Sequence, residues 1–223
     1  MARPLSEDKR TAILAAATEL VAMLGVSAPT AKIAKCAGVA EGTLFTYFAN
    51  KDELLNRLYQ ELKTDLRDAI MAGYPADKSL IDRSRHFWDR YIAWGSAHPL
   101  KQRAIRQLAV SDRITEECKK LVGDAFGQVN DMMRECAAGG AMKHQPPSFV
   151  SAILSAIADT TMDFIAREPA HAKRYTKAGF DAFWKAVAVL LARIKLPGRG
   201  YSVAPNRVTC CQSSPFRGPR ELR

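Results

Sequence analysis

The 223-residue sequence is poor in the residues that build metal sites and disulfide frameworks. It has five cysteines, an odd number with no CxxC spacing, and four histidines with no HExxH motif or other paired-ligand spacing. Metal sites need several such ligands at short, defined spacings. We therefore expect reduced thiols, a cytoplasmic protein, no bound metal ion and no other cofactor.

Motifs of several enzyme classes are also absent. The sequence contains no GxSxG motif, and no glycine-rich phosphate loop follows a predicted strand. Indeed, no alternating apolar–polar pattern of useful length predicts any strand. A helical enzyme with catalytic residues from distant positions remains open, but no motif favours it. We predict that the chain is not an enzyme.

Long apolar runs are missing as well. No early segment joins a basic start to a continuous apolar run, so we expect no secretory signal. The most apolar run, Ala186–Ala192, is far shorter than the ~20 residues that span a bilayer. With 48% hydrophobic and 25% charged residues, the composition is typical of a soluble globular protein without a membrane partner.

Helical periodicity extends over most of the chain, interrupted by glycine and proline. This pattern predicts an all-α protein: an N-terminal three-helix domain in residues 1–50, and a helical domain in residues 51–196. About nine helices are expected: 5–24, two short helices from Thr30 and from Ala40 or Glu41, then 51–72, 79–97, 100–110, 113–138, 147–167 and 171–195. Residues 197–223, rich in Pro, Gly and Arg, are expected to be a disordered basic tail.

The stretch Thr30–Lys51 reads as two short helices joined by a tight turn. We expect Thr30 to cap the first helix and Gly38 to end it in a left-handed conformation. In the second helix, Leu44, Phe45 and Phe48 would face inward, leaving Gly42, Thr43, Thr46 and Tyr47 outside. This arrangement predicts a helix-turn-helix whose second helix reads a DNA major groove. An ordinary helical hairpin is the alternative.

The order of these residues matches a known signature. From Ile33 to Leu54, the sequence IAKCAGVAEGTLFTYFANKDEL closely resembles that of TetR-type transcriptional repressors, approximately IA-x-x-AGVS-x-GTLY-x-[YH]F-x-x-K-x-x-L. The resemblance implies a ligand-responsive transcriptional regulator, usually a repressor, that acts as a homodimer on double-stranded DNA. It assigns these residues to the DNA contact: Thr30, Gly42, Thr43, Thr46, Tyr47 and Lys51.

Three further positions of the predicted DNA contact depart from the family pattern. Ala40 stands where Ser is common, Glu41 where Lys or Arg is common, and Phe45 where Tyr is common. These changes remove two hydroxyls and a cation from the usual contact set. Glu41 would either accept a hydrogen bond from a cytosine amino group or stabilise the start of its helix, and we favour the second.

The net charge of +10 is distributed unevenly. Residues 1–65 hold eight Lys or Arg and eight Asp or Glu, so the N-terminal part of the chain that includes the predicted DNA-binding domain is neutral. The DNA-binding prediction therefore depends on residue placement. A nonspecific polyanion-binding protein is the remaining alternative.

The larger domain carries candidates for a ligand cavity and a dimer interface. Aromatic walls with a few polar groups are typical of sites for organic ligands, although a plain core fits the same pattern. The candidates are Trp88, Tyr91, Trp94, Phe126, Asn130, Met133, Asp159 and Met162. We expect Asp159 and Asp163 to be exposed, because two buried carboxylates would repel. The resemblance places the homodimer interface on the last two helices, 147–167 and 171–195, which suits a palindromic operator.

Overall fold

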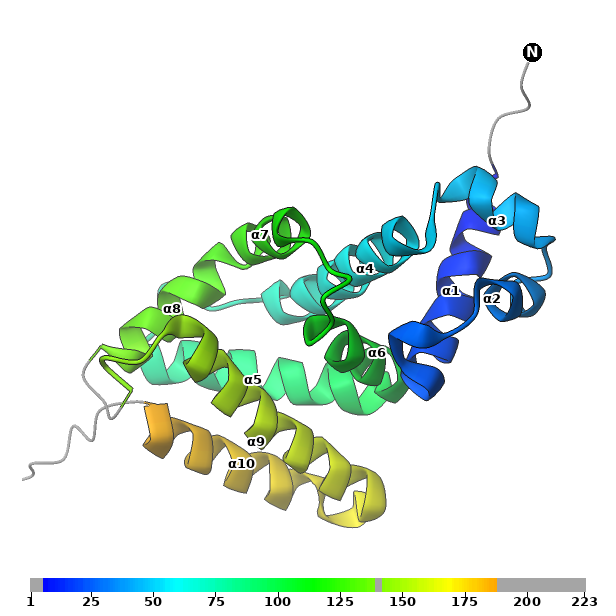
Figure 1. Cartoon of the computed structure of the whole chain (residues 1–223). Helices are drawn as coiled ribbons and strands as arrows, with labels where there is room; N and C mark the ends of the chain where they lie inside the picture. The colour runs from blue at the N-terminus through cyan, green and yellow to red at the C-terminus, as the bar shows by residue number, and fades with distance from the viewer. Residues whose placement is uncertain (1–5, 139–141, 188–223) are drawn as a thin grey trace, which may run out of the picture. The chain divides into compact units, whose positions relative to one another are not determined.

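Secondary structure in the described residues is entirely helical. The computed structural model describes residues 6–138 and 142–187, which form ten α-helices and two 3₁₀ helices (Figure 1). In chain order they are α1 (Glu7–Leu24), η1 (Gly25–Ser27), α2 (Thr30–Cys36), α3 (Glu41–Tyr47), α4 (Lys51–Met71), α5 (Leu80–Ala97), α6 (Pro99–Ala109), α7 (Glu116–Ala125), α8 (Gly127–Ala137), α9 (Pro147–Arg167), η2 (Pro169–His171) and α10 (Ala172–Val187). The predicted all-α class is confirmed, with one more α-helix than expected.

The first three helices share a small hydrophobic core. Ile13 of α1, Ile33 of α2 and Leu44 of α3 are fully buried, and each such side chain contributes ~1.5–3 kcal/mol through burial. α1 ends at Gly25, whose φ of 72° lies in the region that favours glycine. The short α2 and α3 are therefore held by packing on α1, since isolated helices of this length are unstable in water.

α4 begins four residues after α3 and continues into the larger helical part of the chain. The Asn50 side chain accepts a hydrogen bond from the Glu53 backbone N–H at 2.8 Å, which confirms the predicted cap. The Glu53 carboxylate in turn accepts one from the Ala49 N–H at 2.7 Å. The buried face of α4 carries Leu54, Leu55, Leu58, Tyr59, Leu62, Leu66 and Ile70. α4 packs against α1 as well as α5, α6 and α7, so it contacts both parts of the chain.

α5 lies in the middle of the larger helical part (Figure 1). It packs against α4, α6, α8, α9 and α10. Its aromatic side chains Phe87, Trp88, Tyr91 and Trp94 are all buried, as their helical spacing predicted. α6 then packs against α1, which gives the three-helix unit a second contact with the rest of the chain.

The segment expected as one helix, 113–138, is two helices in the structure. α7 ends at Ala125 and α8 begins at Gly127, with Phe126 between them at φ −96° and ψ 20°. Glycines at 123 and 127 make the helix easy to interrupt here. The Gly123 carbonyl accepts from the Phe126 backbone N–H at 3.0 Å and also from the Asn130 side chain at 2.9 Å. The single-helix prediction was wrong because it gave these glycines no weight.

α9 has the predicted bounds and packs along α10. The last helix starts one residue later than predicted, after the short η2. Phe180 and Phe183 of α10 are buried inside the chain, where Phe183 stacks on Trp88 of α5, and Ala158 of α9 is fully buried as well. Residues 188–196 of the predicted last helix and the predicted tail 197–223 lie outside the described residues.

Two described segments, Glu7–Ser27 and Pro147–Arg167, have the length and apolar composition of a membrane span, with mean hydropathy 1.4 and 1.5. Core helices of soluble proteins share these features, so the finding is weak support for a span. The burial differs between the two: 44% of the first window is buried, against 28% of the second. A smaller share of the α9 window than of the α1 window is therefore buried within the chain.

Candidate nucleic-acid interface and ligand cavity

The turn between α2 and α3 has the geometry that the sequence predicted. Gly38 adopts φ 69°, and no atom lies within 4 Å of the position where a Cβ would be. The backbone conformation, and not a shortage of space, therefore requires glycine at this position. The Val39 N–H returns to the Ala34 carbonyl at 3.0 Å, which closes the turn. With Leu44 buried beneath, the two helices form a helix-turn-helix.

The outer face of α3 carries most of the predicted DNA-contact residues. Gly42 and Thr46 are exposed and Thr43 is half-buried. Phe45, expected to face inward, is 42% exposed. Leu44 and Phe48 already fill the space under α3, so the ring of Phe45 points away from the core. It thereby adds an apolar group to the surface that would meet DNA.

Thr30 and Glu41 contact each other in the free protein. Thr30 is the first residue of α2, and Pro29 occupies the cap position, so the predicted cap role of Thr30 was wrong. Its hydroxyl instead donates to the Glu41 carboxylate at 2.6 Å. Glu41 lies in the first turn of α3, where a carboxylate stabilises the helix dipole. Ala40 is the cap residue of α3 and supplies no side-chain hydrogen bond.

Two other hydroxyls of the predicted DNA-contact set also have partners in the chain. The Ser6 backbone N–H donates to the Tyr47 hydroxyl oxygen at 2.9 Å. Ser6 is the cap residue of α1, but its side chain makes no capping hydrogen bond. The Tyr47 O–H hydrogen remains available for a phosphate oxygen. Thr46 donates to the Gly42 carbonyl at 3.1 Å and can accept, or donate after rotation about χ1.

Lys51 is the first residue of α4, an unfavourable place for a cation because the helix dipole is positive there. Burial, followed by the nearby charge of Arg113, lowers the pKa of Lys51, while Asp52 raises it. Arg113 itself pairs with Asp52 at 2.8 Å. A phosphate bound at this helix start would offset the unfavourable effects of the helix dipole and of the Arg113 charge on Lys51.

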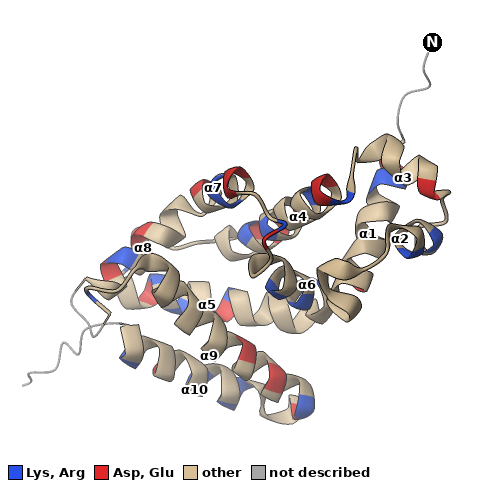
Figure 2. Ribbon diagram, in the orientation of Figure 1, with Lys and Arg blue, Asp and Glu red and all other residues tan. Residues whose placement is uncertain are grey.

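The predicted DNA-contact set omitted two cations. Lys32 and Lys35 lie on α2 beside the turn (Figure 2), both exposed, and neither forms an ion pair with another described residue. Their exposed positions on α2, the first helix of the helix-turn-helix, were the sequence signal that could have predicted them as DNA contacts. They add two cations to the helix-turn-helix, and Lys51 adds another at the start of α4. Such cations typically bind the DNA backbone.

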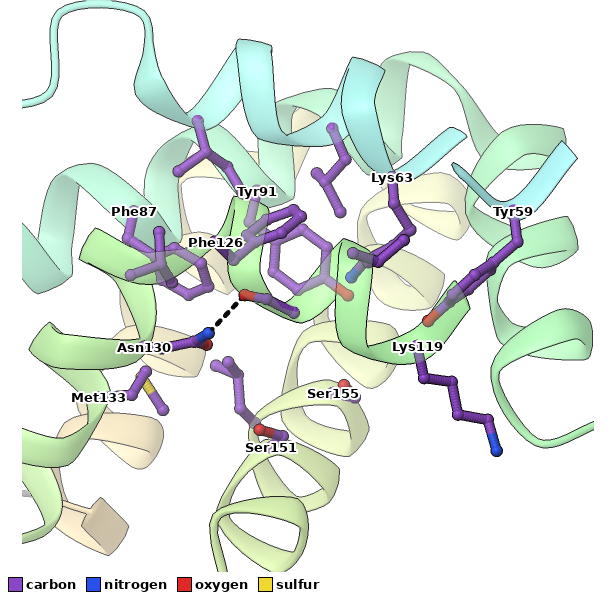
Figure 3. A pocket seen from close by; sticks show the side chains of 16 residues that line it. Tyr59, Lys63, Phe87, Tyr91, Lys119, Phe126, Asn130, Met133, Ser151 and Ser155 are labelled. Carbon is purple, nitrogen blue, oxygen red and sulfur yellow. Dashed lines mark hydrogen bonds between the residues drawn. The ribbon is translucent and has the colours of Figure 1, made fainter. Parts of the chain in front are cut away.

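A cavity of about 240 Å³ lies among α4, α5, α7, α8 and α9 (Figure 3). Four of the predicted ligand residues line it: Tyr91, Phe126, Asn130 and Met133. Several lining residues were not predicted, among them Tyr59, Lys63, Phe87, Ser151 and Ser155. Tyr59, Lys63, Leu66 and Ile70 recur at helical spacing along α4 (59, 63, 66 and 70), which was the available sequence signal.

The other four predicted ligand residues lie elsewhere. Trp88 is fully buried, stacks on Phe183 with ring centroids 5.7 Å apart and donates to the Thr176 carbonyl at 2.9 Å. Trp94 is buried and donates to Asp65 at 3.4 Å. Neither tryptophan lines a cavity described here, so both pack in the core.

Asp159 and Met162 line a different cavity, of about 340 Å³, together with Gln102 and Arg106 of α6. The expectation that Asp159 is exposed was wrong, because its carboxylate accepts from Gln102 at 3.0 Å and pairs with Arg106 at 3.0 Å. Burial raises its pKa, and these two partners oppose the rise. Asp163 is exposed, as expected.

Comparison with known proteins agrees with this geometry. The model for bacterial regulatory proteins of the tetR family matches residues 13–58, from α1 into α4. The HTH-type transcriptional regulator YhgD of Bacillus subtilis is 36% identical over 64 residues, covering 28% of this chain and 34% of that protein. The fatty acid metabolism regulator protein of the same organism is 34% identical over 84 residues, covering 34% of this chain and 42% of that protein. The matches span between about one third and two thirds of the curated relatives' lengths.

Solved structures match over a longer range. A TetR family transcription regulator from Shewanella sp. PV-4 is 28% identical and has a TM-score of 0.70, covering 81% of this chain and 98% of that one. FadR from Bacillus subtilis in complex with stearoyl-CoA has a TM-score of 0.58 at 14% identity, covering 80% and 99%, which establishes the fold alone.

The exposed reading helix, the turn at Gly38 and the helical body behind them define a helix-turn-helix regulator. The family match in α1–α4 and the likeness to the Shewanella regulator identify it more closely. Residues 13–58 carry the helix-turn-helix of the TetR family, and the fold of the chain is similar to that of a TetR family regulator.

Proposed function

We propose that this chain is a sequence-specific DNA-binding transcriptional repressor that acts as a homodimer and leaves its palindromic operator when a small organic ligand binds. The observation that carries the proposal is the outer surface of α3, with Gly42, Phe45 and Thr46 exposed on a helix whose opposite side buries Leu44. Phosphate contacts would come from Tyr47, Lys51, Lys32 and Lys35, and base contacts from Thr43 and Thr46. Thr30 and Glu41 would have to exchange their mutual hydrogen bond for DNA. A protein with this target would reside in the cytoplasm.

Exposed apolar surface on α9 supports the dimer. Phe149, Ala152, Ala156 and Phe164 lie on one exposed face of this helix, and Phe149 and Phe164 are 46% and 41% exposed. Thr160 and Asp163 are exposed on the same face between Ala156 and Phe164. Exposed apolar side chains bordered by polar ones mark interfaces in soluble proteins. A two-fold dimer would hold two α3 helices about one DNA turn apart, ~34 Å, as a palindromic operator requires.

The position of α4 supports a ligand response. Lys51 lies at its first residue, while Tyr59 and Lys63 line the cavity two and three turns further along. A ligand in the cavity that favours one tilt of α4 would change the separation of the two α3 helices. It would do so only through a difference in affinity between the two conformations. In FadR the same fold holds stearoyl-CoA, and for this chain the cavity supports an organic ligand of its own.

Selection of bound sequences from random DNA duplexes tests this proposal. We expect a palindrome to be recovered, and a small molecule that fills the cavity to release it. Retention of DNA without sequence preference, together with steep salt dependence, would favour a nonspecific polyanion-binding protein. Turnover of a small molecule without selective DNA binding would favour a helical enzyme.

A further inference from the structure

The cavity of about 240 Å³ contains one cation that has no carboxylate partner among the described residues. Lys63 extends from α4 into the space that also receives Tyr91 and Phe126 (Figure 3). Its Nζ lies 4.6 Å from the centroid of the Phe126 ring. No carboxylate in residues 6–138 and 142–187 forms an ion pair with it. A buried ammonium without an anionic partner is costly, so its presence calls for a partner that arrives from outside.

The groups around Lys63 leave the ammonium as the one available cation on the cavity lining. The other charged lining residue, Lys119 of α7, pairs with Glu116 at 2.8 Å. The titratable groups that face Lys63 are Tyr59 from its own helix and Tyr91 from α5. α8 and α9 contribute the neutral polar side chains of Asn130, Ser151 and Ser155. Apart from these, the walls are apolar.

We propose that this cavity binds an amphipathic monocarboxylate, with the carboxylate on Lys63 Nζ and the apolar body against the aromatic and aliphatic walls. The assignment rests on the proposed function, because it names the ligand class of the proposed regulator. A monoanion matches the single available cation, whereas a phosphate dianion would bring a second charge that the apolar walls leave unpaired. Neutral ligands of the same shape would leave the ammonium without a partner.

The cavity sets the size of the ligand. At ~30 Å³ for a water-sized group, 240 Å³ admits roughly eight non-hydrogen atoms. A second cavity of about 430 Å³ shares Asn130, Met133 and Ser151 with the first and is also lined by apolar residues together with Arg134, Lys143 and Gln145, so the end of a longer chain can reach into it. Octanoate and 4-phenylbutyrate are suitable probes, one with a linear body and one with an aromatic body.

Binding of a carboxylate is then linked to the protonation of Lys63. Burial lowers the pKa of Lys63 to about 8, and a bound carboxylate would raise it again. The free protein loses this proton above pH 8 and must recover it on binding. Affinity therefore stays constant below about pH 8 and falls above it, by up to about tenfold per pH unit. Burial raises the pKa of Tyr59, and that of Tyr91 to about 12, so both phenols stay protonated near pH 8.

Calorimetric titration of the full chain without DNA tests the assignment. Octanoate is compared with octanamide, and 4-phenylbutyrate with its amide, at pH 7 and pH 9.5. We expect each acid to bind more tightly than its amide at pH 7. We also expect Lys63→Met to weaken the acids by roughly ten- to a hundredfold while leaving the amides unchanged. Lys63→Arg keeps the cation and should restore part of the loss. Lys120→Met, on the exposed side of α7 and outside the cavity, is the matched control.

The outcomes separate this assignment from the proposed function. Equal affinity for acid and amide, no binding of either acid, or an unchanged affinity of Lys63→Met would overturn the carboxylate assignment. None of these results affects selection of a palindrome, which tests the regulator itself. Conversely, carboxylate binding with Lys63-dependent affinity and no selective DNA binding would sustain the assignment of the cavity and reject the regulator.

Discussion

Gly42 lies within α3 at a position where the fold does not need glycine. Its φ is not positive, and no atom lies within 4 Å of the place where a Cβ would be. Glycine in a helix interior costs about 0.5–1 kcal/mol relative to alanine. Its presence on the exposed reading face is therefore best explained by close approach of DNA.

This argument predicts opposite effects of Gly42→Ala on stability and on binding. The free energy of unfolding, measured with urea, should rise by about 0.5–1 kcal/mol, while operator affinity should fall. Gly123→Ala is the matched control, because Gly123 is also helical and open but lies far along the chain in α7. It should stabilise the protein without changing DNA affinity. Unchanged operator affinity of Gly42→Ala would remove the case for close approach at this residue.

Tyr47 and Thr46 are expected to divide the DNA contact between backbone and base. Tyr47→Phe removes the hydroxyl that would reach phosphate, so affinity should fall equally for the operator and for unrelated DNA. Thr46→Ala should change base preference at one position of each half-site, with little effect on unrelated DNA. Selection experiments on both variants give the comparison. If both variants lose affinity uniformly for every sequence, Thr46 does not read bases.

Lys63 makes stability depend on pH in the ligand-free protein. Since its pKa is about 8 in the folded protein and 10.5 when unfolded, the unfolded state binds more protons between these values. The free energy of unfolding therefore rises as the pH increases from about 8 to 10.5. Below pH 8 the folded protein bears the full energetic cost of keeping Lys63 charged in the cavity. Lys63→Met should stabilise the chain at pH 7 by at most about 3 kcal/mol, at ~1.4 kcal/mol per pKa unit. Urea unfolding should show the gain shrinking as pH approaches 10.5, and a gain that is constant with pH would contradict this explanation.

At the scale of helices, Gly179 decides how closely α10 approaches its neighbours. A Cβ there would lie 2.3 Å from Thr161 Oγ1 of α9 and 2.6 Å from a ring carbon of Trp88 in α5. Neither neighbour has room to move, because both are buried. Three helices therefore meet at a position where only glycine fits.

We expect Gly179→Ala to lower the free energy of unfolding by about 1–3 kcal/mol, the usual cost of overpacking a core. Chemical denaturation of the purified variant measures this effect. Gly123→Ala again provides the comparison, since a helical glycine with open space around it should give a change of opposite sign. A neutral or stabilising Gly179→Ala would mean that α10 is packed more loosely than the structure indicates.

Local sequence signals predicted the helices well where a cap, a positive-φ glycine or a steady apolar stripe was present. Asn50, Gly38 and the leucines of α4 are examples. They failed where the outcome depends on side chains distant in sequence. Thr30 is the first helical residue of α2, one position too late to cap it, and its hydroxyl donates to the Glu41 carboxylate across the turn. At the interruption, the Phe126 ring lies 4.6 Å from Lys63 Nζ, a contact between residues 63 positions apart that no local pattern indicates.

At the scale of the whole molecule, the family signature predicted the helix-turn-helix, but the periodicity of single helices could not locate the cavity. Trp88 and Tyr91 have equivalent positions in the apolar pattern of α5, yet Trp88 stacks inside on α10 and Tyr91 lines the cavity. Lys63 was not predicted to line the cavity, because a lysine beside an apolar stripe usually extends into solvent. Its enclosure becomes visible only once α7 and α8 are placed over α4.

The dimer is the remaining property of the whole molecule, and α9 is where it can be tested. Ala156 lies in the middle of the exposed apolar face, so Ala156→Arg would place a charge at the centre of the proposed interface. Burying an unpaired charge there costs more than such interfaces tolerate. At micromolar concentration we expect the unmodified chain to sediment as a dimer and Ala156→Arg as a monomer. Leu121→Arg, at an exposed leucine of α7, should remain dimeric.

Because one α3 helix contacts only half of a palindrome, the monomer should also lose operator affinity while keeping its helical circular dichroism. A monomeric unmodified chain would reject the dimer, and a dimeric Ala156→Arg would place its interface elsewhere.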